Sequence, residues 1–385
     1  MLPQIMRTAE FIAVAGTVAS IAYYAICLWG ALSFLRQQRA RLQPSIVFPP
    51  VSILKPLRGI DPGMYESFRS HTLQDYPEYE IIFGVSDPDD PAINLVHRLQ
   101  AEFPQRGIRL IVCRQRLGAN IKVSNLVQML PHVRHEFLVV NDSDLRVPQN
   151  YLRQATGPLM DPAVGLVTCL YRGVASTTLG SHLESLGIAT DFCAGVLAAR
   201  QLEGIKFGLG STLSFRRRDL VSIGGFEAIA DHLADDYEIG SRLAKMGLKV
   251  VLGSNVVESF LPAYSLRQFL EHQLRWARTL RSARPWGYLG LALTFGLPWA
   301  LLLLAFSRGA LWAWSLFVAA LATRSAVALV VGYRTLGDGQ VASDWWLLPM
   351  RDIIALAVWI ASFAGRQVAW RGDLFTLRNG KLIRD

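Results

Sequence analysis

A chain of 385 residues with 51% hydrophobic residues and a mean hydropathy of +0.28 is too apolar for an ordinary soluble enzyme. Its length allows two or three structural units. The formal net charge of +9 does not form a basic stripe interleaved with stacking aromatic residues, which argues against a nucleic-acid-binding protein. We attribute this charge to basic clusters beside membrane segments, where Lys and Arg attract anionic lipid head groups.

The first apolar segment, residues 11–35, contains no charged residue and is long enough to cross a hydrocarbon core of about 30 Å. It exceeds a typical signal-peptide core, and no small-x-small cleavage site follows it, so we expect a retained anchor. Three basic residues follow it directly: Arg36, Arg39 and Arg41. The positive-inside rule therefore predicts that the next part of the chain faces the cytoplasm.

The middle of the chain, residues 45–284, has the mixed polarity of a globular domain in which strands and helices alternate. This alternation predicts the α/β class, with a parallel sheet and right-handed crossovers in a Rossmann-like layout. The predicted strands are 51–57, 79–85, 108–113 and 136–140, and the predicted helices are 62–73, 92–103 and 121–130. Neither G-x-G-x-x-G after the first strand nor G-x-x-x-x-G-K-[ST] is present, so a bound nucleotide would need a metal and basic side chains.

The fourth predicted strand ends in Asn141-Asp142-Ser143-Asp144, where two carboxylates stand two residues apart. Alternate side chains of an extended segment share a face, and the carboxyl ends of strands are where open α/β sheets bind ligands. Two such carboxylates favour a hard divalent cation that keeps sites open for substrate phosphates. A solvated turn after a buried strand is the alternative explanation of this pattern.

Beyond Asp144 the pattern predicts two more strands, 164–170 and 210–215, and a helix over 181–199. Because that helix is short and carries Asp191, we expect it in a core or an interface rather than across the membrane. The next acidic pair, Asp235 and Asp236, stands at the start of a predicted helix, where the dipole stabilises carboxylates. Simple capping would explain that pair equally well.

The predicted helix 265–280 contains His272, Arg275 and Trp276 and is rich in both basic and apolar residues. Such a helix is typical of one that lies on a membrane surface. The four cysteines are widely spaced, form no C-x-x-C and read as buried thiols of a reducing compartment: Cys27, Cys113, Cys169 and Cys193.

The last hundred residues contain a second apolar block. Residues 286–306 are uncharged and predict a spanning helix, and residues 310–331 predict another despite Arg324. A weaker third candidate, 345–364, is interrupted by Pro349, Arg351 and Asp352.

The tail after these segments is basic, with Arg366, Arg371, Arg378, Lys381 and Arg384. The positive-inside rule places it in the cytoplasm, but three full spans would place it outside. We therefore expect segment 345–364 to be re-entrant or to lie in the interface. The predicted organisation is an anchor with its basic flank (1–44), a cytoplasmic domain (45–284), and membrane helices with a basic tail (285–385). In a bacterium the protein would reside in the inner membrane.

Several short motifs follow one another along the chain: VSILKPLRG (51–59), DPDDPA (87–92), KVSNL (122–126), DSDLRV (142–147), ADDY (234–237) and RW (275–276). Taken in this order, they make the chain resemble the family-two-type nucleotide-sugar glycosyltransferases of the GT-A fold, and most closely the ceramide glucosyltransferase family. The resemblance extends over roughly residues 10–285. One departure is that His272 stands where the family has Gln or Arg, with Gln273 one place late, which weighs against the processive polysaccharide synthases.

The resemblance implies a role for each matching residue. The residues that it implies for donor binding are Lys55, Asp87, Lys122, Asn125, Asp142 and Arg275. Asp142 and Asp144 would bind Mg²⁺ or Mn²⁺, Asp236 would be the general base, and Trp276 and His272 would lie on the acceptor side. The implied reaction moves a hexose or N-acetylhexosamine from a UDP-sugar to a lipid hydroxyl at the bilayer, with inversion to a β-glycoside.

The acceptor implied by the family is ceramide, but a bacterial branch of hopanoid biosynthesis adds N-acetylglucosamine to a polyol hopanoid. The compact C-terminal spans and the Asp-Ser-Asp form of the metal motif favour that branch. Three alternatives stay open: a processive polysaccharide synthase, a polyprenyl-phosphate glycosyltransferase, and a membrane scaffold with a catalytically dead domain. The oligomeric state does not follow from the sequence.

Overall fold

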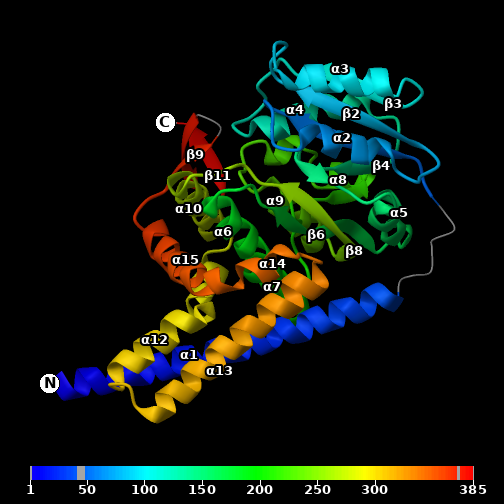
Figure 1. The fold of residues 1–385 in the computed structure, drawn as a ribbon. Helices are drawn as coiled ribbons and strands as arrows, with labels where there is room; N and C mark the ends of the chain where they lie inside the picture. Colours follow the sequence, from blue (N-terminus) through cyan, green and yellow to red (C-terminus); the bar gives the residue numbers. More distant parts are fainter. Residues whose placement is uncertain (1, 41–47, 371–372, 385) are drawn as a thin grey trace. The chain divides into compact units, whose positions relative to one another are not determined.

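The computed structural model of the chain describes residues 2–40, 48–370 and 373–384. The chain divides into two compact units, each described here by itself (Figure 1). The sheet unit comprises Gln38–Ser176, Ile205–Pro262 and Ala369–Asp385, and the helical unit comprises Met1–Gln37, Thr177–Gly204 and Ala263–Val368. This division differs from the predicted one, because 177–204 and 263–284 group with the apolar helices and the tail groups with the sheet. Arg41, Arg371 and the predicted boundary at 44/45 lie outside the described residues.

The sheet unit is built on eight strands in the order β3-β2-β1-β4-β7-β6-β8-β5. Strands β1 (Val51–Leu57), β2 (Tyr79–Val85), β3 (Gly107–Val112) and β4 (Phe137–Val140) are parallel neighbours. They alternate with α2 (Met64–Thr72), α3 (Ala92–Glu102) and α4 (Ile121–Met129). These seven elements match the prediction to within two residues at each end, which confirms the α/β class. All seven residues of β1 are buried, as expected for a central parallel strand.

The other half of the sheet is mixed rather than parallel. Strand β7 (Leu213–Arg216) is antiparallel to β4 and to β6 (Val164–Val174), whereas β6 is parallel to β8 (Lys249–Phe260). The short β5 (Leu145–Arg146) closes the edge against β8. Neither β5 nor β8 was predicted. In β8, polar residues interrupt the apolar run because that strand is only partly buried.

Helix α9 (Asp235–Lys245) packs very closely on the segment before β7. A Cβ atom on Gly240 would lie 2.2 Å from the backbone nitrogen of Gly208, so only glycine permits this approach. Helices α5 (Tyr151–Thr156) and α8 (Arg217–Ser222) complete the unit.

The tail forms a second sheet in the order β11-β10-β9, from strands β9 (Gln367–Trp370), β10 (Asp373–Arg378) and β11 (Lys381–Arg384). The loop between β10 and β11 is Asn379-Gly380, and both residues have positive φ (51° and 79°). Asn-Gly between alternating hydrophobic residues is a strong hairpin signal. The prediction of a merely basic tail overlooked it.

The helical unit contains three described helices long and apolar enough to cross a membrane: Gln4–Arg39, Leu311–Thr335 and Gln340–Ser362. The first is most of α1 (Leu2–Ala40), the second joins α13 (Leu311–Val327) to the π-helix η6 (Ala328–Thr335), and the third ends in α15 (Leu348–Ser362). Segment 345–364, the weakest candidate by sequence, therefore meets the same criterion of length and composition.

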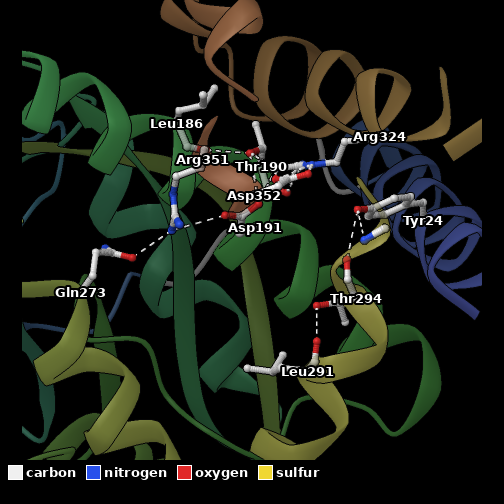
Figure 2. Close-up of polar contacts among 11 residues, drawn as sticks. Tyr24, Leu186, Thr190, Asp191, Gln273, Leu291, Thr294, Arg324, Arg351 and Asp352 are labelled. Atoms are coloured by element: carbon white, nitrogen blue, oxygen red, sulfur yellow. Dashed lines mark hydrogen bonds and ion pairs between the residues drawn. The ribbon is translucent and has the colours of Figure 1, made fainter. Parts of the chain in front are cut away.

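The predicted single helix over 286–306 is wrong: the segment is a pair, Pro285–Thr294 and Gly296–Phe306, bent by 54°. Side-chain hydroxyl groups of α1 form hydrogen bonds with backbone groups at the bend. Tyr24 donates to the Thr294 carbonyl at 3.1 Å and accepts from the Gly296 amide at 3.2 Å, and Ser20 donates to the Leu293 carbonyl at 2.6 Å. The Tyr24 contact is drawn in Figure 2. Irregular backbone at membrane depth is tolerated where such partners exist.

The remaining helices of this unit are α6 (Leu179–Gly187), the π-helix η3 (Ile188–Phe192), α7 (Cys193–Leu202), α10 (Leu266–Ala283) and α14 (Gln340–Asp344). The predicted helix 181–199 is thus confirmed as helical, with a π turn in its middle. All four cysteines are buried, and none forms a disulfide.

Candidate active site

The loop after β4 carries the predicted metal motif, and hydrogen bonds of Asn141 and Ser143 hold it in place. Asn141 is fully buried, and its side-chain amide donates to Tyr151 Oη at 2.8 Å and to the Ser211 carbonyl at 2.7 Å. Ser143 donates to Asp61 Oδ2 at 2.5 Å. These hydrogen bonds anchor Asn141 and Ser143, the residues that precede Asp142 and Asp144.

Asp144 lies deeper than Asp142. Its Oδ2 accepts a hydrogen bond from Ser259 of β8 at 2.5 Å. Burial raises the pKa of Asp144 to about 6, and the negative charge of Asp142 adds to that increase. The charge of Asp142 therefore disfavours ionisation of Asp144.

Lys122, in the first turn of α4, joins the two acidic motifs. Its Nζ lies 2.8 Å from Asp142 Oδ1 and 3.0 Å from Asp235 Oδ2. Burial by itself would lower the pKa of Lys122, but the carboxylates of Asp142 and Asp235 outweigh it and hold the pKa above its usual range. Lys122 is therefore a permanent cation between β4 and α9.

Asp236 follows in the first turn of α9. Its Oδ1 accepts from the Tyr237 amide at 2.8 Å. Burial, reinforced by Asp235, raises the pKa of Asp236 to about 6, while Lys122 opposes the increase. The N-cap residue Ala234 makes no side-chain cap, so the helix begins directly at the acidic pair.

The carboxylates of the two motifs converge on one point of the backbone. A Cβ atom built on Gly210 would lie 3.2 Å from Asp142 Oδ2 and 3.4 Å from Asp236 Oδ2. The absence of a side chain at Gly210 therefore leaves the space that both carboxylates face. The sequence analysis missed this glycine, although the G-L-G run at 208–210 was a visible signal of close backbone approach.

Lys55 and Asn125, both predicted to bind the donor, are buried at 0% and 1% exposure. Lys55 Nζ donates to the Asp142 carbonyl at 2.8 Å, and burial lowers its pKa to about 7 against the opposing charges of Asp144 and Asp142. Asn125 accepts from Ser86 at 2.8 Å, next to the exposed Asp87 at the end of β2. Lys55 and Asn125 are thus buried and form hydrogen bonds near the strand ends, whereas Asp87 is exposed to solvent.

The tail hairpin reaches the segment that precedes Asp235. The Leu382 amide donates to the Asp231 carbonyl at 2.7 Å, and the Leu233 amide donates to the Gly380 carbonyl at 3.3 Å. The same segment also contacts α4: the side-chain amide of Asn120, the N-cap of α4, donates to the His232 carbonyl at 2.8 Å. The loop before the acidic pair is thus held between the tail and the helix that carries Lys122.

The remaining predicted residues, His272, Arg275 and Trp276, belong to α10 of the helical unit. The His272 ring stacks on Tyr264 with centroids 5.4 Å apart and lies 5.7 Å from the Trp276 ring. Helix α10 opens with a capping box of Ser265 and Gln268 and buries only Phe269 completely, which fits the predicted amphipathic helix.

Asp142 and Asp144 are the residues that could hold a metal. Among the described residues, no group of three or more His, Cys, Asp or Glu side chains is arranged around a common point. A pair of carboxylates nevertheless suits Mg²⁺ or Mn²⁺, because these ions take one or two carboxylates and complete their shell with water and substrate phosphates. Burial and, second, the charge of Asp142 raise the pKa of Asp144, and such an ion would relieve the repulsion between the two carboxylates.

A family model described as glycosyl transferase family 21 matches residues 12–383. The chain belongs to this family. Two curated relatives from Caenorhabditis elegans are ceramide glucosyltransferase 3, 25% identical over 269 residues, and ceramide glucosyltransferase 1, 22% identical over 239 residues. These alignments cover 69% and 62% of this chain and 58% and 51% of the relatives, so the chain spans just over half the length of each.

The fold is also that of a solved glycosyltransferase. The mannosyltransferase PcManGT from Pyrobaculum calidifontis, determined in complex with GDP-Man and Mn²⁺, superimposes with a TM-score of 0.59 at 23% identity. The match covers 91% of this chain and 99% of the mannosyltransferase chain. The predicted GT-A fold is confirmed.

Filling the space at Gly210 should impair sugar transfer without unfolding the protein. In Gly210→Ala the new methyl group would force Asp142 to move by a few tenths of an ångström and would bring Asp236 into direct contact. Because small misplacements of reacting groups cost up to about 10²-fold in rate, we expect kcat/KM to fall at least tenfold. The measurement is kcat/KM together with the thermal midpoint. Gly107→Ala, whose Cβ would make an ordinary 3.5 Å contact, is the control, and full activity of Gly210→Ala would contradict the convergence.

Proposed function

We propose that this family 21 protein is a membrane-bound inverting glycosyltransferase that moves a hexose or N-acetylhexosamine from a UDP-sugar to a lipid hydroxyl. The observation that carries the proposal is the convergence of Asp142, Asp236 and the permanent cation Lys122 at the carboxyl ends of the strands. This edge is where open α/β sheets bind ligands. A scaffold that had lost catalysis would have no need of carboxylates held so close together.

The donor side is assigned to Asp87, Lys122, Asp142 and Asp144. Asp87 is exposed at the end of β2 and would contact the nucleoside, and Lys122 would help to hold the nucleotide. Asp142 and Asp144 would hold Mg²⁺ or Mn²⁺; when bound, the ion supplies positive charge to the departing diphosphate. The Mn²⁺ and GDP-Man bound to the mannosyltransferase of the same fold support this assignment.

Asp236 is proposed as the general base. With a pKa of about 6 it is mostly ionised at neutral pH and still basic enough to accept a proton. As the lipid oxygen forms its bond to the anomeric carbon, its proton passes to Asp236. The bond between that carbon and the diphosphate oxygen breaks, and UDP leaves. A single in-line displacement turns an α-linked donor into a β-glycoside.

The acceptor is proposed to be a hydroxyl of either ceramide or a polyol hopanoid. Ceramide is supported by the names of the relatives, and the hopanoid by the compact C-terminal segments and the Asp-Ser-Asp motif. Arg275 would pair with the diphosphate, while His272 and Trp276 would line the acceptor side. Their helix α10 combines basic and apolar residues, as expected where a lipid head group emerges from the bilayer.

The membrane topology is proposed from the tail. Because β10 and β11 belong to the sheet unit, the chain must cross the bilayer an even number of times between residues 262 and 369. We assign these crossings to the bent pair, which includes α12 (Gly296–Phe306), and to Leu311–Thr335, which follows after a short loop. Segment Gln340–Ser362 would then lie in the interface beside α10, whose Arg281 donates to the Ser362 carbonyl. The sheet unit and the tail would face the cytoplasm, in a bacterial inner membrane.

The activity is tested with the full-length protein in lipid nanodiscs containing Mg²⁺ or Mn²⁺. UDP-glucose and UDP-N-acetylglucosamine are each offered with ceramide and with a polyol hopanoid, and the products are identified by mass. We expect one donor–lipid pair to give a β-glycolipid and UDP, and EDTA to abolish the transfer. Release of no UDP with any lipid would favour the scaffold alternative.

Replacing the proposed base should remove turnover but not donor binding. General-base assistance is worth about 10²–10⁴-fold, so we expect kcat of Asp236→Asn to fall by that factor. The dissociation constant for UDP should change less than about threefold, because Asp142, Asp144 and Lys122 remain. Asp161→Asn, an exposed carboxylate of the same unit, serves as the control. Turnover retained in Asp236→Asn would refute its role.

The topology is tested by labelling single cysteines with a membrane-impermeant maleimide in intact cells. Ser307→Cys, in the loop between α12 and α13, should react from outside. Gly339→Cys, where nothing lies within 4 Å of a new Cβ atom, should react only after permeabilisation. The wild-type protein is the background control, since its four cysteines are buried. The reverse labelling pattern would make Gln340–Ser362 the crossing segment and the bent pair re-entrant.

A further inference from the structure

The helical unit contains a buried cluster of charges that the proposed reaction does not use. Arg324, in the middle of Leu311–Thr335, is 2% exposed, and each of its guanidinium nitrogens has an acceptor. It donates to Asp191 Oδ1 at 2.6 Å, to Asp352 Oδ2 at 3.0 Å and to the Thr190 carbonyl at 3.1 Å, as Figure 2 shows. Ionised groups inside a membrane helix are costly unless paired in this way.

Arg351, the neighbour of Asp352 in the chain, extends this cluster toward α10. Its Nη2 lies 3.3 Å from Asp191 Oδ2 and donates to Gln273 Oε1 at 2.9 Å (Figure 2). Gly187 leaves the space for this guanidinium, since a Cβ there would lie 2.5 Å from Arg351 Nε. Within the part of the chain that the structure describes, Nε and Nη1 of Arg351 have no hydrogen-bond partner. The single nitrogen Nη2 therefore carries both contacts.

Gln273 connects Arg351 to Glu184 within the helical unit. Its Nε2 donates to Glu184 Oε2 at 2.6 Å, and Glu184 Oε1 lies 3.3 Å from His272 Nδ1. Burial by itself would raise the pKa of Glu184, but His272, Arg351 and Gln273 outweigh it and bring the pKa below its usual value. Glu184 therefore stays ionised and holds two adjacent residues of α10 at once.

The same π turn that supplies Asp191 also contacts α10 through an aromatic ring. Phe192 meets Trp276 edge to face, with centroids 5.7 Å apart, and Trp276 in turn lies 5.7 Å from His272. In the π-helix Ile188–Phe192, Asp191 thus contacts the buried cluster and the next residue, Phe192, contacts α10. Such widened turns are frequent at functional sites.

We propose that Arg351 and Gln273 are positioning residues, which link the buried Arg324–Asp191–Asp352 cluster to α10 and fix His272, Arg275 and Trp276 for recognition of the lipid hydroxyl. This proposal rests on the proposed function for what α10 recognises, but the link itself consists of contacts within the helical unit. Gln273 is its weakest point, because it is the neutral bridge between two charged partners.

The test replaces this bridge with Gln273→Met, which keeps the length of the side chain and removes both hydrogen bonds. A hydrogen bond to a charged group is worth about 10–100-fold in an equilibrium, so we expect the KM for the lipid to rise about tenfold. Acceptor-independent hydrolysis of the UDP-sugar should change less than twofold, and the thermal midpoint should stay within about 2 °C. Amide hydrogen exchange over Leu266–Ala283 should become faster.

Two further variants separate positioning from general packing. Glu271→Gln, on the same helix, cuts only the exposed pair with Arg267 and should leave every readout unchanged. Arg351→Met should reproduce the defect of Gln273→Met, and the double variant should be no worse than Arg351→Met alone, since one chain of contacts is cut once.

Unchanged KM for the lipid together with unchanged exchange in α10 would overturn the proposal. A lower thermal midpoint with equal losses in hydrolysis and transfer would overturn it too, because that result indicates a purely structural role. If the wild-type protein transfers sugar to no lipid, the proposed function fails, while the exchange measurement still tests the link.

Discussion

The ion pairs of Lys122 hold the candidate site together. One partly buried ammonium group lies between Asp142, which follows strand β4, and Asp235, which opens helix α9, so three segments far apart in the chain meet at one charge. Without it, the carboxylates after β4 and those at the start of α9 would face one another uncompensated. Its position depends in turn on the N-cap Asn120, which also fixes the loop that leads to Asp235.

The same physical constraint acts in the helical unit, again through a cation between two aspartates. There a buried guanidinium, Arg324, is surrounded by Asp191 and Asp352, and the charges that weakened the prediction of a helix over 345–364 are the ones that hold it. Burying ionised groups is costly, and each unit meets that cost by pairing residues from different segments. In each unit the paired cluster lies beside residues to which we assign a role in transfer: Asp236 in the sheet unit and α10 in the helical unit.

The parts of the fold that were predicted correctly are those with a strong local signal. The parallel half of the sheet was predicted nearly to the residue because β1 and β2 are buried, apolar and bounded by turns. In the mixed half, β6 and β7 overlap the predicted strands 164–170 and 210–215, but β8 and β5 were not predicted. Strand β8 is only partly buried, and β5 has two residues. The bend at Phe295 went unpredicted although Gly296 and Pro298 next to it disfavour a continuous helix. Its hydrogen-bond partners, Ser20 and Tyr24, lie about 270 residues away in the chain. The tail hairpin was predictable from Asn379-Gly380, but the sequence analysis interpreted the tail only by its basic charge.

The sequence by itself determined the α/β class, the apolar segments and the resemblance that led to family 21, because these depend on local pattern and on the order of motifs. It also identified Asp142, Asp144, Lys122 and Asp236 as a set. Only the tertiary structure decided that Lys122 bridges Asp142 and Asp235. It also decided that two carboxylates converge on Gly210 and that Lys55 and Asn125 are buried near the strand ends. The reason is physical: which atoms of a side chain are buried or paired depends on segments that meet only when the chain is folded.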